Sequence, residues 1–153
     1  MELADILPEE SVVFCTDETS KTNVLKMLAA AAAAHTGQSV EDVFEAVDNR
    51  EALGSTGLGN GIAIPHGKLP GLKGVSAVFA KLTHPVDFDA IDDQPVDLLV
   101  MLLAPLGAGA DHLKALAMVA RILRTDSIVE RLRAAREPGQ AYELLTRTIA
   151  KAA

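Results

Sequence analysis

An apolar run at residues 96–104 constrains the fold of this chain more than any other segment. It consists of Val-Asp-Leu-Leu-Val-Met-Leu-Leu-Ala, in which Asp97 is the only charged residue. A strand with one face in water alternates apolar and polar residues, whereas a strand covered on both faces is almost continuously apolar. We therefore expect a central strand in a sheet with helices on both sides.

Shorter segments complete this prediction. Further strands are expected at 11–15, 62–64 and 75–82, and an irregular or edge segment at 85–91. Helical patterns lie between these strands, and such interleaving is typical of layered α/β folds. The sequence thus predicts an α/β fold in three layers, with a mixed β-sheet covered by helices on both faces. Nothing divides residues 1–153, which we expect to form a single domain.

Helix boundaries are marked by residues that favour them. Thr19 or Ser20 is expected to cap an alanine-rich helix that Gly37 terminates. Ser39, followed by Asp42, approximates a capping box at the start of a second helix. Three further helices are expected, one opened by Asp111, one capped by Thr125 or Asp126, and one with Pro138 in its first turn.

Charge and composition exclude several classes of function. The formal net charge is −7 and there is no Trp, which disfavours a nucleic-acid partner and favours a basic protein partner. Cys15, the only cysteine, lies in an apolar run and is expected to be a buried, inert thiol. The N-terminus does not resemble a signal peptide, and the apolar runs are too short to span a membrane. We expect a cytoplasmic protein without membrane insertion.

His66 is the leading candidate for chemistry. It lies in Gly54-Ser-Thr-Gly-Leu-Gly-Asn-Gly-Ile-Ala-Ile-Pro-His-Gly-Lys68, where the density of glycine indicates a specifically shaped backbone. Pro65 fixes φ just before the histidine, which should hold the imidazole at a strand end. A neutral ring nitrogen in a fixed position is a good nucleophile or general base. Most lone histidines are structural, but this loop favours a functional one.

Competing sites fit the sequence poorly. The glycine spacing differs from the dinucleotide and P-loop patterns, and Leu69 stands where a P-loop needs a hydroxyl. The four histidines have no short ligand spacing, so neither a metal site nor another cofactor site is expected. Ser55 lacks the glycine pattern of a hydrolase nucleophile.

A phosphate site around His66 fits better. Arg50 precedes the glycine loop, and its guanidinium suits phosphate. A helix-end arginine that is solvated, or salt-bridged to the nearby Asp48 or Glu51, is an equally good interpretation. His112 follows Asp111 in the first turn of a predicted helix, where backbone N–H groups favour an anion. On these residues alone, a solvent-exposed histidine is the better interpretation of His112.

A longer pattern now connects these residues. The segment Arg50-Glu-Ala-Leu-Gly-Ser-Thr-Gly-Leu-Gly-Asn-Gly-Ile-Ala-Ile-Pro-His-Gly-Lys68 closely resembles the active-site signature of enzyme IIA of the bacterial phosphoenolpyruvate:sugar phosphotransferase system, in the fructose/mannitol class. The segments Phe88–Pro105 and Asp111-His112-Leu113 look like that family too. The resemblance covers nearly the whole chain and implies one EIIA type-2 domain with a mixed sheet between helices.

The resemblance implies a phosphohistidine relay. By analogy, His66 accepts a phosphoryl group from the phosphohistidine of an HPr-like phosphocarrier, His112 is the second active-site histidine, and Arg50 neighbours the phosphate. Residues 89–97 and the stand-alone length look most like the nitrogen-regulatory type. Relatives of that type bind regulatory targets, among them sensor kinases and ion transporters. Such a chain is a phosphotransferase component that needs no cofactor or metal.

Two alternatives stay open. Nothing in the residues excludes the separate EIIA of a fructose/mannitol-type transporter, which passes phosphate to an EIIB cysteine. The chain would also fit a non-catalytic binding module that keeps the fold without phosphotransfer, although the presence of Arg50, His66 and His112 argues against this.

Overall fold

Strand β6 (Val96–Pro105) lies at the centre of a mixed sheet, as its apolar sequence predicts. The computed structural model describes residues 1–15, 17 and 20–152, with side chains up to residue 147. In this part of the chain, six strands form one sheet in the order β1-β5-β6-β3-β2, and β4 also pairs with β6. The other strands are β1 (Val12–Cys15), β2 (Gly57–Gly59), β3 (Ile62–Ala63), β4 (His66–Leu69) and β5 (Ser76–Val86).

Both strand directions occur in the sheet. Strand β5 runs antiparallel to β6 and parallel to β1. Strands β3 and β4 both run parallel to β6, whereas β2 runs antiparallel to β3. The expectation of a mixed sheet is therefore confirmed.

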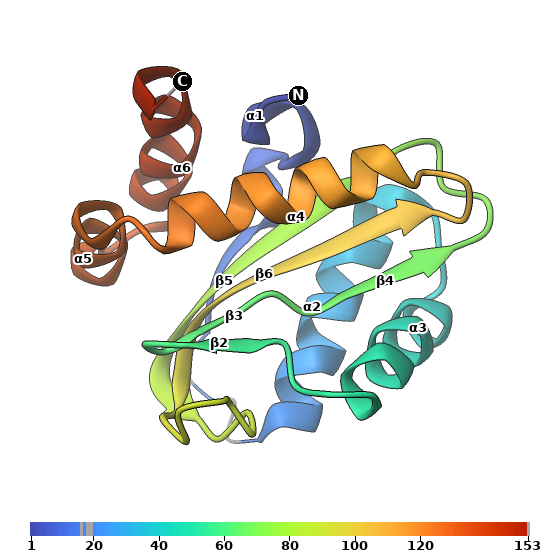
Figure 1. The fold of residues 1–153 in the computed structure, drawn as a ribbon, viewed down its shortest axis with the longest axis horizontal. Helices are drawn as coiled ribbons and strands as arrows, with labels where there is room; N and C mark the ends of the chain where they lie inside the picture. The colour runs from blue at the N-terminus through green and yellow to red at the C-terminus, as the bar shows by residue number, and fades with distance from the viewer. Residues whose placement is uncertain (16, 18–19, 153) are drawn as a thin grey trace.

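Helices cover both faces of this sheet (Figure 1). Helices α2 (Lys21–Thr36) and α3 (Val40–Ala52) pack on one face, and α1 (Leu3–Ile6), α4 (Ala110–Leu123), α5 (Asp126–Ala134) and α6 (Pro138–Ala152) on the other. A hydrophobic core lies on each face of the sheet, and successive residues of β6 point into the two cores alternately. Leu98, Val100 and Leu102 face α4, whereas Leu99, Met101 and Leu103 face α2 and α3. The three-layer α/β prediction is confirmed.

The expected N-caps of α2 and α3 are observed, whereas that of α5 is formed without a side-chain hydrogen bond. The hydroxyl oxygens of Ser20 and Ser39 accept hydrogen bonds from the backbone N–H of Asn23 and Asp42, both at 3.1 Å. Thr19, the alternative cap, lies outside the described residues. Thr125 holds the N-cap position of α5, but its hydroxyl donates to the carbonyl of Arg121 instead of capping the helix.

Three expectations are corrected. Strand β5 continues to Val86, so Pro85-Val86 belongs to a strand that resumes pairing with β6 after a register shift, and only the residues after it are irregular. Cys15, expected to be buried, is partly exposed. Strands β2 and β4 were not expected; β2 forms a hairpin with β3 through Asn60-Gly61, both with positive φ, and β4 pairs with β6.

No helix in the described part of the chain is long and apolar enough to cross a membrane.

Candidate functional site

His66 begins strand β4, immediately after a short break in the sheet. Strands β3 and β4 pair one after the other with the same edge of β6 and keep the same register, with Ile62 opposite Leu98 and His66 opposite Leu102. Pro65, which has no N–H, lies in the break, and its carbonyl accepts the backbone N–H of Leu102 at 3.0 Å. The proline therefore interrupts the ladder just before the histidine while the chain stays attached to the central strand.

The ring of His66 is half-buried and held by one hydrogen bond. Nδ1 lies 2.8 Å from the carbonyl oxygen of Ile64. A carbonyl oxygen only accepts, so Nδ1 carries the proton and donates it. In the neutral ring, the lone pair is then on Nε2, which is the nitrogen available for nucleophilic attack.

The strand that carries His66 packs unusually close to helix α3. A Cβ added to Gly67 would lie 3.1 Å from the backbone carbon of Ala46 and 3.2 Å from the nitrogen of Val47. Glycine is favoured here because a larger residue would require the backbone of the helix to move away from the strand. The close contact brings the C-terminal turn of α3, which carries Arg50, towards the histidine strand.

The ring of His112 lies beside the ring of His66, and it comes from α4, on the face of the sheet opposite α3. It occupies the first turn of α4, which follows Gly109 with φ +40°, and only 7% of the residue is exposed. The two rings have centroids 5.5 Å apart and planes inclined by 55°. The preference for a solvent-exposed His112, drawn from its local sequence, was therefore wrong. Among the described residues, none forms a hydrogen bond with its buried Nδ1.

Arg50 also lies in the neighbourhood of His66. Its Nη1 donates to the carbonyl of Gly54 at 2.9 Å. The expected alternative, an ion pair with Asp48 or Glu51, does not form in the part of the chain that the structure describes. The guanidinium charge instead acts on His66 and lowers its pKa.

Both histidines favour the neutral state. Burial is the main cause that lowers the pKa of His66 below its ordinary value of 6.5; Arg50 lowers it further, while the hydrogen bond to Ile64 and the charge of Glu51 oppose the shift. The pKa of His112 is lowered by burial, then by His66 and Lys68. Near neutral pH, the site therefore offers an unprotonated nitrogen beside a guanidinium, which suits nucleophilic attack on an anionic group such as phosphoryl.

Glu51 also belongs to this region, although the sequence alone did not assign it a place there. Only 6% of it is exposed, and it forms an ion pair with Lys21 at 2.9 Å. The signal was available, because Val43, Val47 and Glu51 are spaced four apart and share the buried face of α3. Lys21 is distant in sequence, so its role as partner was not predictable from spacing.

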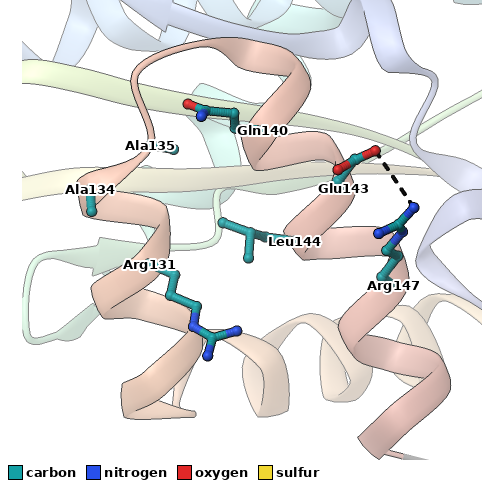
Figure 2. A pocket seen from close by; sticks show the side chains of 7 residues that line it. All are labelled: Arg131, Ala134, Ala135, Gln140, Glu143, Leu144 and Arg147. Atoms are coloured by element: carbon teal, nitrogen blue, oxygen red, sulfur yellow. Dashed lines mark ion pairs between the residues drawn. The ribbon is translucent and has the colours of Figure 1, made fainter.

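Other surface features lie elsewhere. A groove of about 520 Å³ between α5 and α6 is lined by Arg131, Ala134, Ala135, Gln140, Glu143, Leu144 and Arg147, with an ion pair of Arg147 and Glu143 at 3.8 Å (Figure 2). A second pocket of about 400 Å³ lies between the β2–β3 hairpin and the helices α4 and α5. Arg50, His66 and His112 line neither pocket.

Comparison with known proteins identifies the family that this chain resembles. The family described as "Phosphoenolpyruvate-dependent sugar phosphotransferase system, EIIA 2" matches residues 5–148. The chain is 48% identical to a nitrogen regulatory protein of Bradyrhizobium diazoefficiens over 153 residues, with both chains fully covered. It is 43% identical over 150 residues to a nitrogen regulatory protein of Escherichia coli K12, covering 97% of this chain and 91% of that one.

A solved structure shares the fold. The crystal structure of nitrogen regulatory protein IIA-Ntr from Neisseria meningitidis superposes with a TM-score of 0.86 at 37% identity. The alignment covers 94% of this chain and 98% of that one. The likeness extends over most of the chain, so the arrangement of sheet and helices is already known in a solved protein.

Proposed function

Because the chain belongs to the EIIA 2 family of the phosphoenolpyruvate-dependent sugar phosphotransferase system, we propose that it is a regulatory phosphoryl carrier in which His66 accepts the phosphoryl group. The donor is the phosphohistidine of an HPr-like phosphocarrier. One observation carries the proposal: the Nδ1–H of His66 is bound to the carbonyl of Ile64, which leaves Nε2 as the nucleophile beside His112.

The transfer step exchanges one N–P bond for another. The lone pair of His66 Nε2 attacks phosphorus as the bond between phosphorus and the donor's histidine nitrogen breaks, and that electron pair returns to the donor ring. The proton on Nδ1 of His66 stays in its hydrogen bond to Ile64. The product is a phosphoramidate, which remains a good donor for onward transfer.

Arg50 and His112 stabilise the charge that passes between the two nitrogens. The guanidinium of Arg50 is permanently charged and suits the equatorial oxygens of the transferring group. His112 lies with its ring beside that of His66 and is neutral near pH 7, so it contributes an N–H donor without repelling an approaching cation of the carrier. Fixed donors aimed at developing charge are among the largest contributions to catalysis.

The surface near the histidines suits a protein partner. Leu113, next to His112, and Leu106, in the loop before α4, are 67% and 62% exposed. Exposed apolar side chains next to a reactive centre favour docking of a folded carrier, and the net charge of −7 favours a basic one.

The output that we propose is regulatory. The similar proteins of B. diazoefficiens and E. coli are named nitrogen regulatory proteins. By likeness to them, the phosphorylation state of His66 would be recognised by target proteins, for which a sensor kinase or an ion transporter are the candidates. The alternative is transfer of the phosphoryl group to an EIIB cysteine, which is consistent with the family's description as a sugar phosphotransferase system.

The test is the intact mass of the protein after incubation with phosphoenolpyruvate, enzyme I and an HPr-type carrier. We expect one acid-labile phosphoryl adduct on the wild type and none on His66→Ala. An adduct of equal size on His66→Ala would rule out His66 as the acceptor. Transfer of the label to a purified EIIB cysteine would favour the transport role over the regulatory one.

A further inference from the structure

Glu51 is a buried carboxylate beside the histidine pair, and the transfer step described above gives it no role. Its Oε2 accepts the backbone N–H of Thr56 at 3.0 Å, its Oε1 accepts the Thr56 hydroxyl, and Lys21 Nζ lies 2.9 Å from Oε2. Burial of a carboxylate is costly unless it is paired and hydrogen-bonded, and here it is both. A leucine or valine at this position would pack the helix without any such partners, so the presence of a carboxylate suggests a role other than packing.

Two routes of hydrogen bonds lead from Glu51 to the reactive groups. In the first, the carbonyl of Thr56 accepts the N–H of Ile64 at 3.1 Å, and the carbonyl of Ile64 accepts the Nδ1–H of His66 at 2.8 Å. The backbone groups of Thr56 thereby connect the carboxylate to the strand whose Ile64 carbonyl accepts the Nδ1–H of His66.

The second route leads to the arginine. The backbone carbonyl of Glu51 accepts the N–H of Gly54 at 3.1 Å, and the carbonyl of Gly54 accepts Nη1 of Arg50 at 2.9 Å. Both the nucleophile and the guanidinium are therefore connected to one buried residue at the end of α3.

We propose that Glu51 is a positioning residue of the phosphoryl site: its carboxylate sets the ring orientation of His66 through the first route, while its backbone carbonyl takes part in the route to Arg50. The inference rests on the proposed function, because the geometry that Glu51 fixes is that of the nucleophile. Lys21 neutralises the carboxylate, so the network holds the backbone without repelling an incoming phosphoryl group. Among the residues that the structure describes, the other charged or titratable groups acting at this pair of rings are Arg50 on α3, Lys68 on β4 and His112 on α4.

Three variants separate positioning from stability. Glu51→Gln keeps the shape of the side chain but loses the charge and one acceptor for Thr56. The double variant Lys21→Met with Glu51→Gln also removes the lysine charge, which the single variant leaves, within the described chain, with only the exposed Asp89, at 3.5 Å, as an anionic partner. Glu45→Gln, on the exposed face of the same helix, makes the same change in net charge and serves as the control.

We expect Glu51→Gln to slow single-turnover phosphoryl acceptance about 10-fold at saturating carrier, because small displacements of reacting groups are costly. The double variant should unfold at a higher urea concentration than Glu51→Gln yet remain as slow. Glu45→Gln should match the wild type. A double variant that regains rate together with stability would overturn the proposal, as would wild-type transfer by Glu51→Gln.

A second measurement needs no phosphorylation. In ¹⁵N NMR of the unphosphorylated protein, the wild-type ring of His66 should show the tautomer with the proton on Nδ1, and both Glu51 variants should show a larger share of the other tautomer. An unchanged tautomer in both would overturn the positioning role. Absence of a phosphoryl adduct on wild-type His66 would instead overturn the proposed function, while the NMR comparison would still decide the role of Glu51.

Discussion

The ring of His112 lies 5.5 Å from the ring of His66, centroid to centroid, although one belongs to the first turn of α4 and the other to strand β4. The two residues meet because β4 runs parallel to β6 and α4 begins after the short loop that follows β6. The contact between the two histidines therefore depends on β6, because α4 begins near the end of the sheet towards which both β6 and β4 run.

Replacement of His112 tests whether this contact contributes to transfer. We expect His112→Ala to slow phosphoryl acceptance about 100-fold, as is typical when one preorganised donor to developing charge is removed. The adduct should still form on His66. Rapid-quench measurement of the rate checks this, with His84→Ala, an exposed position on β5, as the control. Wild-type rates in His112→Ala would remove His112 from the mechanism.

The acceptance rate should depend on pH in a defined direction. Burial and Arg50 lower the pKa of His66 below 6.5, so its ring stays unprotonated as pH falls past that value. Acceptance should therefore hold at pH 6.5 and decline only when pH falls through the lowered pKa. Arg50→Gln removes a charge that lowers this pKa, so the decline should begin at a higher pH. Rates measured at saturating carrier, with the carrier's own titration recorded separately, test this; a decline that starts above pH 6.5 in the wild type would contradict it.

The contact between Gly67 and α3 predicts a specific loss of stability. Gly67→Ala places a methyl group 3.1 Å from the backbone carbon of Ala46, and forced overpacking typically costs about 1–3 kcal/mol. Urea unfolding measures the change in free energy. Gly74→Ala is the matched control, because no heavy atom lies within 4 Å of a Cβ at that position. Equal stability of the two variants would show that α3 shifts without cost.

Docking of the carrier should depend on the exposed leucine beside His112. We expect Leu113→Asp to raise the KM for the carrier about 10-fold, the cost of roughly 1.4 kcal/mol of binding, while kcat changes little. Ile91→Asp, another highly exposed position, precedes the opposite end of β6 and should behave as the wild type. Steady-state kinetics with varied carrier distinguish the two; a fall in kcat without a change in KM would contradict a docking role.

The sequence predicted the parts of the fold that have strong local signals. Strand β6 followed from its unbroken apolar character, and the starts of α2 and α3 from Ser20 and Ser39. Strand β2 is too short for periodicity to detect, although Asn60-Gly61 is a dipeptide typical of hairpins. The extension of β5 to Val86 was missed because proline usually ends a central strand, and pairing there resumes only beyond a register shift.

The sequence singled out candidate residues for the site but did not predict their burial. The pattern from Arg50 to Lys68 singled out His66, whereas the local sequence of His112 favoured an exposed side chain. Its burial results from packing of α4 on the sheet, a long-range arrangement that a first-turn position does not encode. The Lys21–Glu51 pair likewise joins the start of α2 to the end of α3, and only the folded chain brings the two together.

The position of the phosphoryl group on the imidazole tests the central claim most directly. The hydrogen bond from His66 Nδ1 to the carbonyl of Ile64 leaves Nε2 as the nucleophile. Correlated ³¹P and ¹⁵N NMR of the phosphorylated protein, labelled at histidine, identifies the bonded nitrogen. The account predicts phosphorus on Nε2 of His66, with Nδ1 still protonated. Phosphorus on Nδ1 of His66, or on either nitrogen of His112, would contradict it.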